Sequence, residues 1–518
     1  MKELPSEIWL HIASFIPDAT LKRLTGVNLL FYNISMDLRY KSIVLQRLDS
    51  RTMMLLKRLS CVTIPARITQ TLMSLSPQRS RRWKAIHAPP SSSFRHFLHP
   101  FRLLGYGSGP NNSNKPRPEE EGTRALIIAL PAMPNVTTFT IDSHSWGQHS
   151  GTRIQDFLNT AWASFGSNLR KLSLRGHAAS FRTIIGSTPS LPQVEELFFE
   201  LTDNPTSSVM STEDDRILIN VFAPFINSFS PKLQALTIWA WTSLDLSAFF
   251  RCLGQFPLLT CFNFQTSFLR TFKHDPSSLS HFIQQHCAQL EILVLKLNQN
   301  PVLHTIQMEQ PLSEWIYNTF QESHFSHLLE LQLYPSALPR GFDGLLTCIQ
   351  SSAKTIHTLV VRDRYLDAQD VSRLIDILPS NTKSLRLNVL EMDIHLYDSL
   401  STRLPELRSL SLYISKVLPD LPVTIILDLL RKLGILLTSD TLQTFISNIN
   451  TRKYIDWKLR DIGVWQSGYN VSHDLMSALR NSIPSVVSFW GLGNIEPDLM
   501  PYDSVIDWST RNIDDGIQ

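Results

Sequence analysis

The sequence predicts an α/β fold, in which a small three-helix head precedes an irregular solenoid with a curved parallel sheet and outer helices. Three observations support this fold class. Apolar residues recur at helical spacing over residues 4–38, a short strand-like phrase recurs ten times from 134 to 412, and helical patterns separate the copies. One helix and one strand cannot bury their apolar faces alone, so stacked copies must share a continuous core.

The head is the stretch "LPSEIWLHIASFIPDATLKRLTGVNLLFYNISMD", residues 4–37. Pro5 suits a first helical turn, because its missing N–H has no helical partner there. The apolar residues that follow have the spacing of one helix face: Ile8, Trp9, Ile12, Phe15 and Ile16. Pro17 ends this helix, and later apolar residues predict two more. A unit of about 40 residues lies at the lower limit for an independent core, so we expect it to need a partner.

The predicted head covers residues 1–45, and residues 46–75 keep helical spacing as an extension of it. Residues 76–122 are rich in Pro, Gly, Ser and Asn, which is typical of a flexible linker. Residues 1–118 carry 18 Lys plus Arg against 5 Asp plus Glu, whereas the remainder carries 30 against 40. A basic first part and a mildly acidic body, residues 123–518, predict different partners for the two.

The body repeats one phrase, with large apolar residues at three fixed positions. Five copies follow a proline: "PNVTTFTI", "PQVEELFF", "PKLQALTI", "PLLTCFNF" and "PELRSLSL". Five lack it: "LRKLSL", "LEILVL", "LLELQL", "IHTLVV" and "TKSLRL". Helical patterns lie between copies, and further strands are expected near 454 and 484. The phrase resembles the LxxLxL strand of the leucine-rich repeat, although the Asn expected three residues later appears only as Asn298, and His177 stands at one equivalent position.

Composition restricts the class of protein. The hydrophobic fraction is 43% and the charged fraction 18%, which is typical of folded proteins. No apolar run approaches the roughly 18 residues of a membrane span, and the first residues lack the apolar core of a secretory signal. We therefore expect a cytoplasmic or nuclear protein. Five scattered cysteines without a CxxC pair predict reduced thiols rather than a disulfide framework.

No catalytic constellation emerges, so we expect no enzyme, cofactor or metal site. "GYGSG" at 105 lacks the GK[ST] of a phosphate loop. His324 and His327 lack a third metal ligand. His286 beside Cys287 lies on an apolar helix face, which favours a core role. Glu391 and Asp393 form a pair of carboxylates of a kind too common to indicate catalysis. The run "RSRRWK", Arg79 to Lys84, is a weak candidate for nucleic acid, because a tryptophan lies among cations; a solvated linker or localisation signal explains it better.

The head resembles a known family, the F-box, through "LPSEIWLHIASFI" and then Asp18, Leu21, Leu24, Val27, Asn28 and Phe31. The match covers residues 2–45 and precedes a repeat domain, as in leucine-rich-repeat F-box proteins. It departs at "VNLLF", where the family often has a basic residue.

The resemblance implies the substrate receptor of a Skp–cullin–F-box ubiquitin ligase. The head would bind the Skp adaptor, and through it a cullin, while the repeats bind an unknown protein substrate. The residues matching the family's apolar positions are Leu4, Pro5, Ile8, Ile12, Leu21, Val27 and Phe31. The sequence does not divide them between internal packing and adaptor contact.

Two alternatives remain. In one, the chain is a leucine-rich-repeat scaffold without ligase function, and the head only caps the solenoid. In the other, the basic first part binds nucleic acid. The substrate-binding residues are unknown; candidates lie between the strand leucines, at Arg170, Lys171, Glu195, Glu196, Gln234 and Glu330.

Overall fold

The structure is a computed structural model of the 518-residue chain. It describes residues 6–16, 18–21, 24, 31, 42–45, 54, 71–74, 118–143, 151–186, 188, 191–203, 212–266, 268–272, 275–297, 309–334, 340–352, 354–390, 392–414, 439–466 and 473–490. The chain divides into two compact units, Met1–Leu233 and Gln234–Gln518, which are described separately.

The first unit contains the head and the first repeats. Its elements are α1 (Ser6–Ser14), α2 (Asp18–Leu21), β1 (Ser42–Leu45), β2 (Thr71–Ser74), α7 (Pro118–Ala129), η2 (Leu130–Ala132), β3 (Thr138–Asp142), α8 (Gly151–Phe165), η3 (Gly166–Asn168), β4 (Lys171–Gly176), α9 (Ala178–Gly186), β5 (Glu196–Thr202), α10 (Thr212–Ile217), η4 (Leu218–Phe222) and α11 (Ala223–Asn227). Strands β1 to β5 pair in parallel and in chain order.

The second unit continues the same alternation of strand and helix. Its elements are β6 (Ala235–Trp241), α12 (Ser247–Cys252), β7 (Cys261–Thr266), α13 (Phe268–Thr271), α14 (Ser277–His286), β8 (Ile292–Lys296), α15 (Glu309–Glu322), β9 (Glu330–Tyr334), α16 (Gly341–Ser351), β10 (Thr358–Leu366), α17 (Ala368–Ile377), β11 (Ser384–Val389), α18 (Ile394–Arg403), β12 (Ser409–Ile414), α20 (Ser439–Asn450), β13 (Asp461–Gln466), α21 (His473–Ser482) and β14 (Ser488–Trp490). Its strands also pair in parallel and in chain order.

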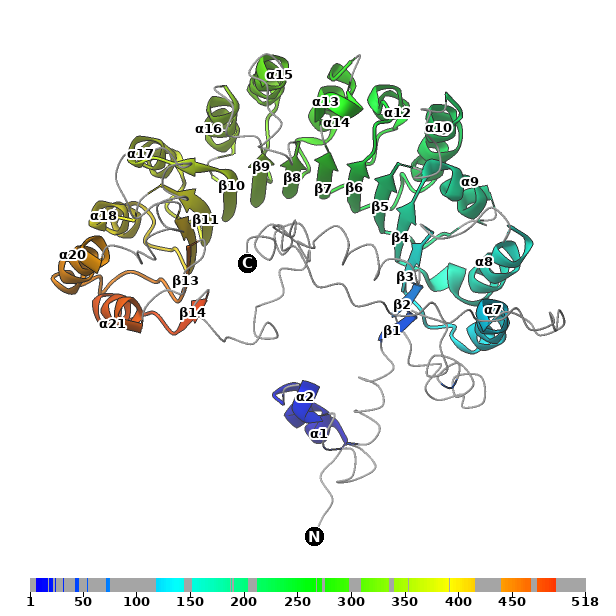
Figure 1. Cartoon of the computed structure of the whole chain (residues 1–518), viewed down its shortest axis with the longest axis horizontal. Helices are drawn as coiled ribbons and strands as arrows, with labels where there is room; N and C mark the ends of the chain where they lie inside the picture. The colour runs from blue at the N-terminus through cyan, green and yellow to red at the C-terminus, as the bar shows by residue number, and fades with distance from the viewer. Residues whose placement is uncertain are drawn as a thin grey trace, which may run out of the picture. The chain divides into compact units, whose positions relative to one another are not determined.

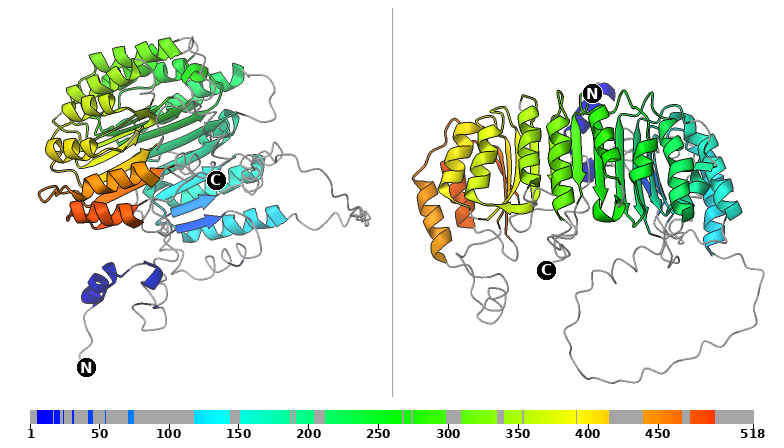
Figure 2. Two further views of the ribbon diagram at one scale, coloured as in Figure 1. Left: turned by 60° about the vertical axis from the view of Figure 1, so that its left-hand side comes forward. Right: turned by 90° about the horizontal axis from the view of Figure 1, so that it is seen from above.

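Within each unit the described helices from α7 onward cover one face of the parallel strands (Figures 1 and 2). The core lies between the two layers, because the apolar positions of the phrase point toward the helices. Leu385, for example, pairs in register with Leu410, and both are fully buried. In the first unit Phe139 contacts Trp162 and Phe165 edge-to-face, with ring centroids 5.7 and 5.1 Å apart. Such geometry adds stability to the burial of the rings.

The predicted fold class is confirmed by the described repeats. Each of the ten phrases forms a strand, from β3 to β12, and the expected later strands are β13 and β14. The predicted helical patterns ahead of three phrases are α8, α14 and α17. Thr382, the one polar residue at a first apolar position, is also fully buried, because its hydroxyl donates to the Pro379 carbonyl at 2.7 Å.

The structure differs from the prediction before residue 123. The last residues of the predicted head form β1, and β2 lies inside the predicted helical extension. Both segments are only four residues long, so periodicity does not separate helix from strand. The last residues of the predicted linker belong to α7, which begins at Pro118, and the rest of that linker lies outside the described residues, as does Arg79 to Lys84.

Candidate protein-binding surfaces

Helix α1 of the head and the turn that follows it carry two apolar stripes rather than the single face predicted. One stripe consists of Trp9, Ala13 and Ile16, and the other of Ile8, Ile12 and Phe15. Both have the spacing i, i+4, i+7, so the sequence pattern does not rank them. On a helix the two stripes lie about 100° apart, because each residue of one follows a residue of the other.

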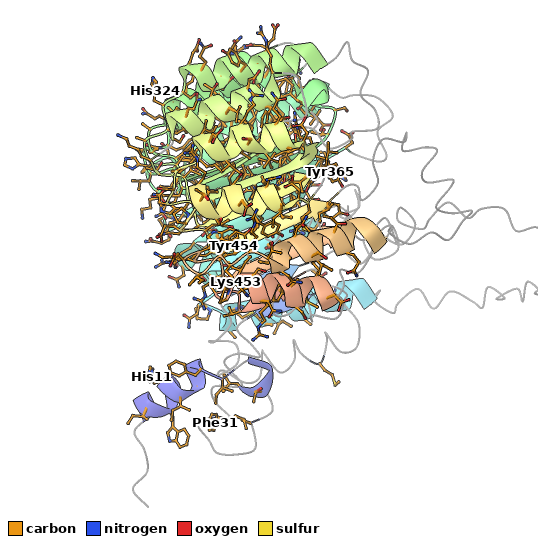
Figure 3. All side chains as sticks on the ribbon, turned by 90° about the vertical axis from the view of Figure 1, so that its left-hand side faces the viewer. His11, Phe31, His324, Tyr365, Lys453 and Tyr454 are labelled. Carbon is orange, nitrogen blue, oxygen red and sulfur yellow. The ribbon has the colours of Figure 1, made fainter. Side chains whose placement is uncertain are left out.

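The first stripe packs inside the head. Ala13, Leu21 and Phe31 are buried together, with Trp9, Ile16 and Leu24 packed against them. The Trp9 and Phe31 rings meet edge-to-face with centroids 5.4 Å apart, and Figure 3 labels Phe31 in this cluster. The expected second helix is present as α2, and the expected third lies largely outside the described residues.

The second stripe is exposed. Ile8 is 44%, Ile12 38% and Phe15 75% exposed. These three side chains form an apolar edge along α1 and the turn that follows it. The Phe15 ring contacts the ring of His11, with the two centroids 5.0 Å apart. A contiguous exposed apolar strip on a small helical unit is typical of a protein-binding surface.

The structure separates the predicted adaptor-binding residues into two groups. Ile8 and Ile12 lie on the exposed stripe, whereas Leu21 and Phe31 belong to the core of the head. Leu4, Pro5 and Val27 lie outside the described residues. The prediction missed Phe15 as a surface residue, although its position three residues after Ile12 was the available signal.

The repeat positions proposed for substrate binding are partly paired with each other. Arg170 lies 3.9 Å from Glu195, and Lys171 lies 2.8 Å from Glu196, with β4 and β5 in register. Glu330 accepts a hydrogen bond from Gln332 at 2.9 Å. Exposed pairs of this kind contribute little stability, so they leave these side chains available at small cost.

Charged residues also occupy more deeply buried strand positions. Arg175 of β4 lies 3.4 Å from Glu200 of β5, and its guanidinium lies 5.3 Å from the centroid of the Phe198 ring. In the second unit, Lys296 of β8 lies 5.4 Å from the centroid of the Tyr334 ring on β9. Cation–π contacts between adjacent strands therefore recur on the sheet.

His177 replaces the asparagine that the repeat resemblance leads one to expect. Its Nδ1 lies 3.3 Å from the Thr202 carbonyl oxygen and 3.2 Å from the Thr202 hydroxyl, at the end of the next strand. Hydrogen bonding from one repeat to the next is thus retained with a different side chain.

The residues considered for catalysis have structural roles where they are described. His286 is buried, and its Nε2 accepts a hydrogen bond from the Phe256 amide at 3.0 Å. Asp393 caps α18 by accepting from the Leu396 amide at 2.8 Å, while Glu391 lies outside the described residues. His324 and His327 are exposed, and no group of three possible metal ligands occurs within the described ranges. The described cysteines, Cys252, Cys261, Cys287 and Cys348, take part in no disulfide.

Comparison with known proteins adds a distant structural likeness. Neither a scan against protein-family models nor a search of curated proteins found a match. The crystal structure of the leucine-rich repeat-containing protein LegL7 from Legionella pneumophila is similar over 61% of this chain and 87% of that chain, with 15% identity and a TM-score of 0.30.

The described repeats have a leucine-rich-repeat-like fold. The repeated strand phrase, the parallel strand register and the buried leucines all have this pattern. In the portion of the chain that the structure describes, no helix is both long and apolar enough to cross a membrane.

Proposed function

We propose that this chain is the substrate-recognition subunit of a Skp–cullin–F-box ubiquitin ligase. The exposed stripe of Ile8, Ile12 and Phe15 supports the proposal most, because it lies in the part of the sequence that resembles the F-box. The head already has a core of its own around Leu21 and Phe31, so the second stripe is available to a partner. That partner is the Skp adaptor, which connects the chain to a cullin.

The chain makes no covalent bond in this role. It holds a protein substrate on its repeats and thereby raises the effective concentration of substrate lysines near a ubiquitin carrier bound elsewhere in the assembly. Neither a cofactor nor a metal is required. Polar side chains at the starts of the strands in both units would bind the protein, among them Lys171, Glu196 and Glu330.

The alternative is a leucine-rich-repeat scaffold that binds a protein without a ligase. The repeats support both functions equally, and the head distinguishes them. Titration of purified full-length chain with purified Skp adaptor, followed by size-exclusion chromatography with a cullin, tests the proposal. Saturable adaptor binding and a ternary complex support the receptor. An adaptor that does not bind the folded chain contradicts it and favours the scaffold.

A further inference from the structure

The second unit has a continuous row of equivalent residues just before its strands. The amide of His357 donates to the Leu329 carbonyl, that of Lys383 to His357, that of Arg408 to Lys383, that of Arg460 to Arg408, and that of Val487 to Arg460, all at 2.8 or 2.9 Å. These six positions therefore stand side by side across β9 to β14. We call them the basic edge row.

The row has cations in its middle and apolar residues at its ends. Lys383, Arg408 and Arg460 are exposed, and His357 is partly exposed. Leu329 at one end is 38% and Val487 at the other 69% exposed. His324 and Lys453 lie toward this edge of the unit, where the strands begin, and Tyr365 lies toward the opposite edge (Figure 3).

The three cations of the row form no ion pair of their own in the described part of the chain. Among the described residues, no ion pair joins a carboxylate to Lys383, Arg408 or Arg460. Glu406 lies near them, but its Oε1 pairs with Lys458 Nζ at 2.5 Å. The hydrogen bond from Lys458 lowers the pKa of Glu406, and the charges of Arg408 and Lys383 lower it further.

The equivalent positions before the other described strands do not form a row of cations. In the first unit Arg170 is followed in register by Glu195, which lies 3.9 Å away. In the second unit the positions preceding Leu329 are Gln234, Thr260 and Glu291. The cations thus gather at the start of β11 to β13, in a body whose overall charge is negative.

We infer that the basic edge row binds an extended acidic segment of a partner protein that has an apolar side chain at each end. Strands lie about 4.8 Å apart, so the five steps from Leu329 to Val487 span about 24 Å. An extended segment of roughly eight residues covers that length at about 3.3 Å per residue. The inference deepens the proposed function by naming the chemistry of the protein that the repeats bind, and it does not depend on the adaptor.

The apolar ends favour a protein segment over nucleic acid. Val487 adjoins Arg460 in the row, and Ile455, in the turn before β13, is exposed as well. Exposed aliphatic side chains bind apolar residues of a peptide, whereas a single-stranded nucleic acid requires aromatic side chains on which bases stack. The six members of the row include no tryptophan, tyrosine or phenylalanine.

The test is fluorescence anisotropy with the full-length chain and a labelled eight-residue peptide that has leucine at both ends and six glutamates between. We expect saturable binding that weakens with salt, because the cations are exposed. A peptide of the same composition with its leucines in the centre is expected to bind several-fold more weakly. A single-stranded oligonucleotide of equal charge is also titrated. No saturable peptide binding, equal binding of the two peptides, or tighter oligonucleotide binding would overturn the inference.

Matched variants locate the site. Arg408→Glu is expected to weaken peptide binding at least tenfold, and Val487→Ser several-fold. Arg480→Glu is the control, since Arg480 is an exposed arginine on α21 outside the row. It is expected to change binding less than twofold. An equal loss of peptide affinity in Arg408→Glu and Arg480→Glu would mean that binding depends only on the net charge of the chain, and would overturn the assignment of the site. Unchanged thermal unfolding confirms that each exposed substitution preserves the fold, and adaptor binding is unaffected.

Discussion

The rings of Trp9 and Phe31 meet edge-to-face with their centroids 5.4 Å apart, and this contact determines which side of α1 faces the interior of the head. Trp9 belongs to the inner stripe and its neighbour Ile8 to the exposed one. Because Phe31 lies far along the chain from α1, the contact also connects the two ends of the head. Adjacent residues of α1, such as Ile8 and Trp9, therefore lie on the surface and against the core of this small unit, respectively.

Phe31→Ala is expected to unfold the head. Truncating a buried phenylalanine costs about 3–5 kcal/mol, which is comparable with the stability of a whole small domain. Limited proteolysis should show faster cleavage between residues 6 and 31, while the repeats remain protected. Phe31→Leu, which keeps most of the apolar volume, should stay resistant. Equal protection of wild type and Phe31→Ala would show that Phe31 is not part of the head's core.

The buried His286 should make the second unit less stable in mild acid. Its Nδ1 lies 2.7 Å from the Phe282 carbonyl and donates to it, so its Nε2 is left to accept from the Phe256 amide. Burial lowers the pKa of His286. The unfolded chain takes up the proton near the ordinary value of about 6.5, but the folded chain resists it, so stability falls as pH drops through that region.

Urea denaturation at pH 7.5 and 5.5 measures this effect. His286→Leu leaves the Phe256 amide without its acceptor and should cost about 1–3 kcal/mol at pH 7.5. The same variant should lose less further stability on acidification than wild type. His281→Leu is the control, because His281 is exposed on the same helix. A wild-type pH dependence unchanged by His286→Leu would refute the assignment.

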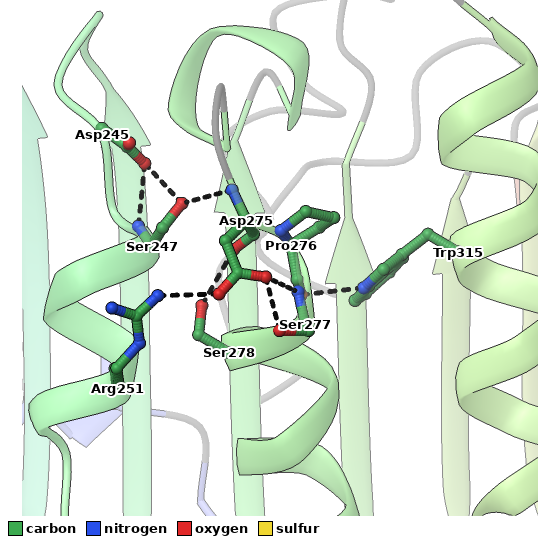
Figure 4. Close-up of polar contacts among 8 residues, drawn as sticks. All are labelled: Asp245, Ser247, Arg251, Asp275, Pro276, Ser277, Ser278 and Trp315. Carbon is green, nitrogen blue, oxygen red and sulfur yellow. Dashed lines mark hydrogen bonds and ion pairs between the residues drawn. The ribbon is translucent and has the colours of Figure 1, made fainter.

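Asp275 and Pro276 together connect three consecutive repeats on the helix side (Figure 4). Its carboxylate accepts from the Ser277 hydroxyl, from the Ser277 amide at 3.0 Å and from Arg251 at 2.7 Å. Its own amide donates to Ser247, and the next residue, Pro276, accepts from Trp315 at 2.9 Å. The carboxylate thus accepts from the first residue of α14 while contacting α12.

Asp275→Ala should destabilise the second unit by about 1–2 kcal/mol, because Ser277 and Arg251 lose a charged hydrogen-bond acceptor. Asp275→Asn keeps an acceptor for the Ser277 amide and should cost less. Arg251→Ala should cost less than about 1 kcal/mol, because that ion pair is exposed. The bonds from Ser277 and Arg251 lower the pKa of Asp275, so its contribution is present above about pH 4 and is lost as pH falls below it. Chemical denaturation checks the ranking, and equal stability of Asp275→Ala and wild type would contradict it.

The repeats were predictable because their signal is local and repeated. Each strand needs only three apolar positions, and ten copies reinforce one another even where Thr382 replaces an apolar residue. The strands β1 and β2 were not predicted, since segments of four residues are too short to show a distinctive period. Distances between phrases were also too irregular to predict which helices would be long.

The surfaces were less predictable than the fold. The two stripes of α1 have identical spacing, so only the position of Phe31 in space separates Ile12 from Ala13. The basic edge row brings together residues from separate repeats, such as Lys383 and Arg460, through the strand register. Neither relationship is visible in a window of sequence, because each depends on a tertiary contact.

The measurement that tests the central claim most directly is the affinity of purified Skp adaptor for the full-length chain carrying Ile8→Asp and Ile12→Asp. Charges on the exposed stripe should weaken adaptor binding at least about 100-fold, since burying each isoleucine is worth roughly 1.5–3 kcal/mol. The head should stay folded, because its core residues are untouched. Ile128→Asp, which makes the same replacement at an exposed isoleucine on α7, should leave the affinity within about twofold of wild type. Equal adaptor affinity of the double variant and wild type, or no binding by wild type, would contradict the account.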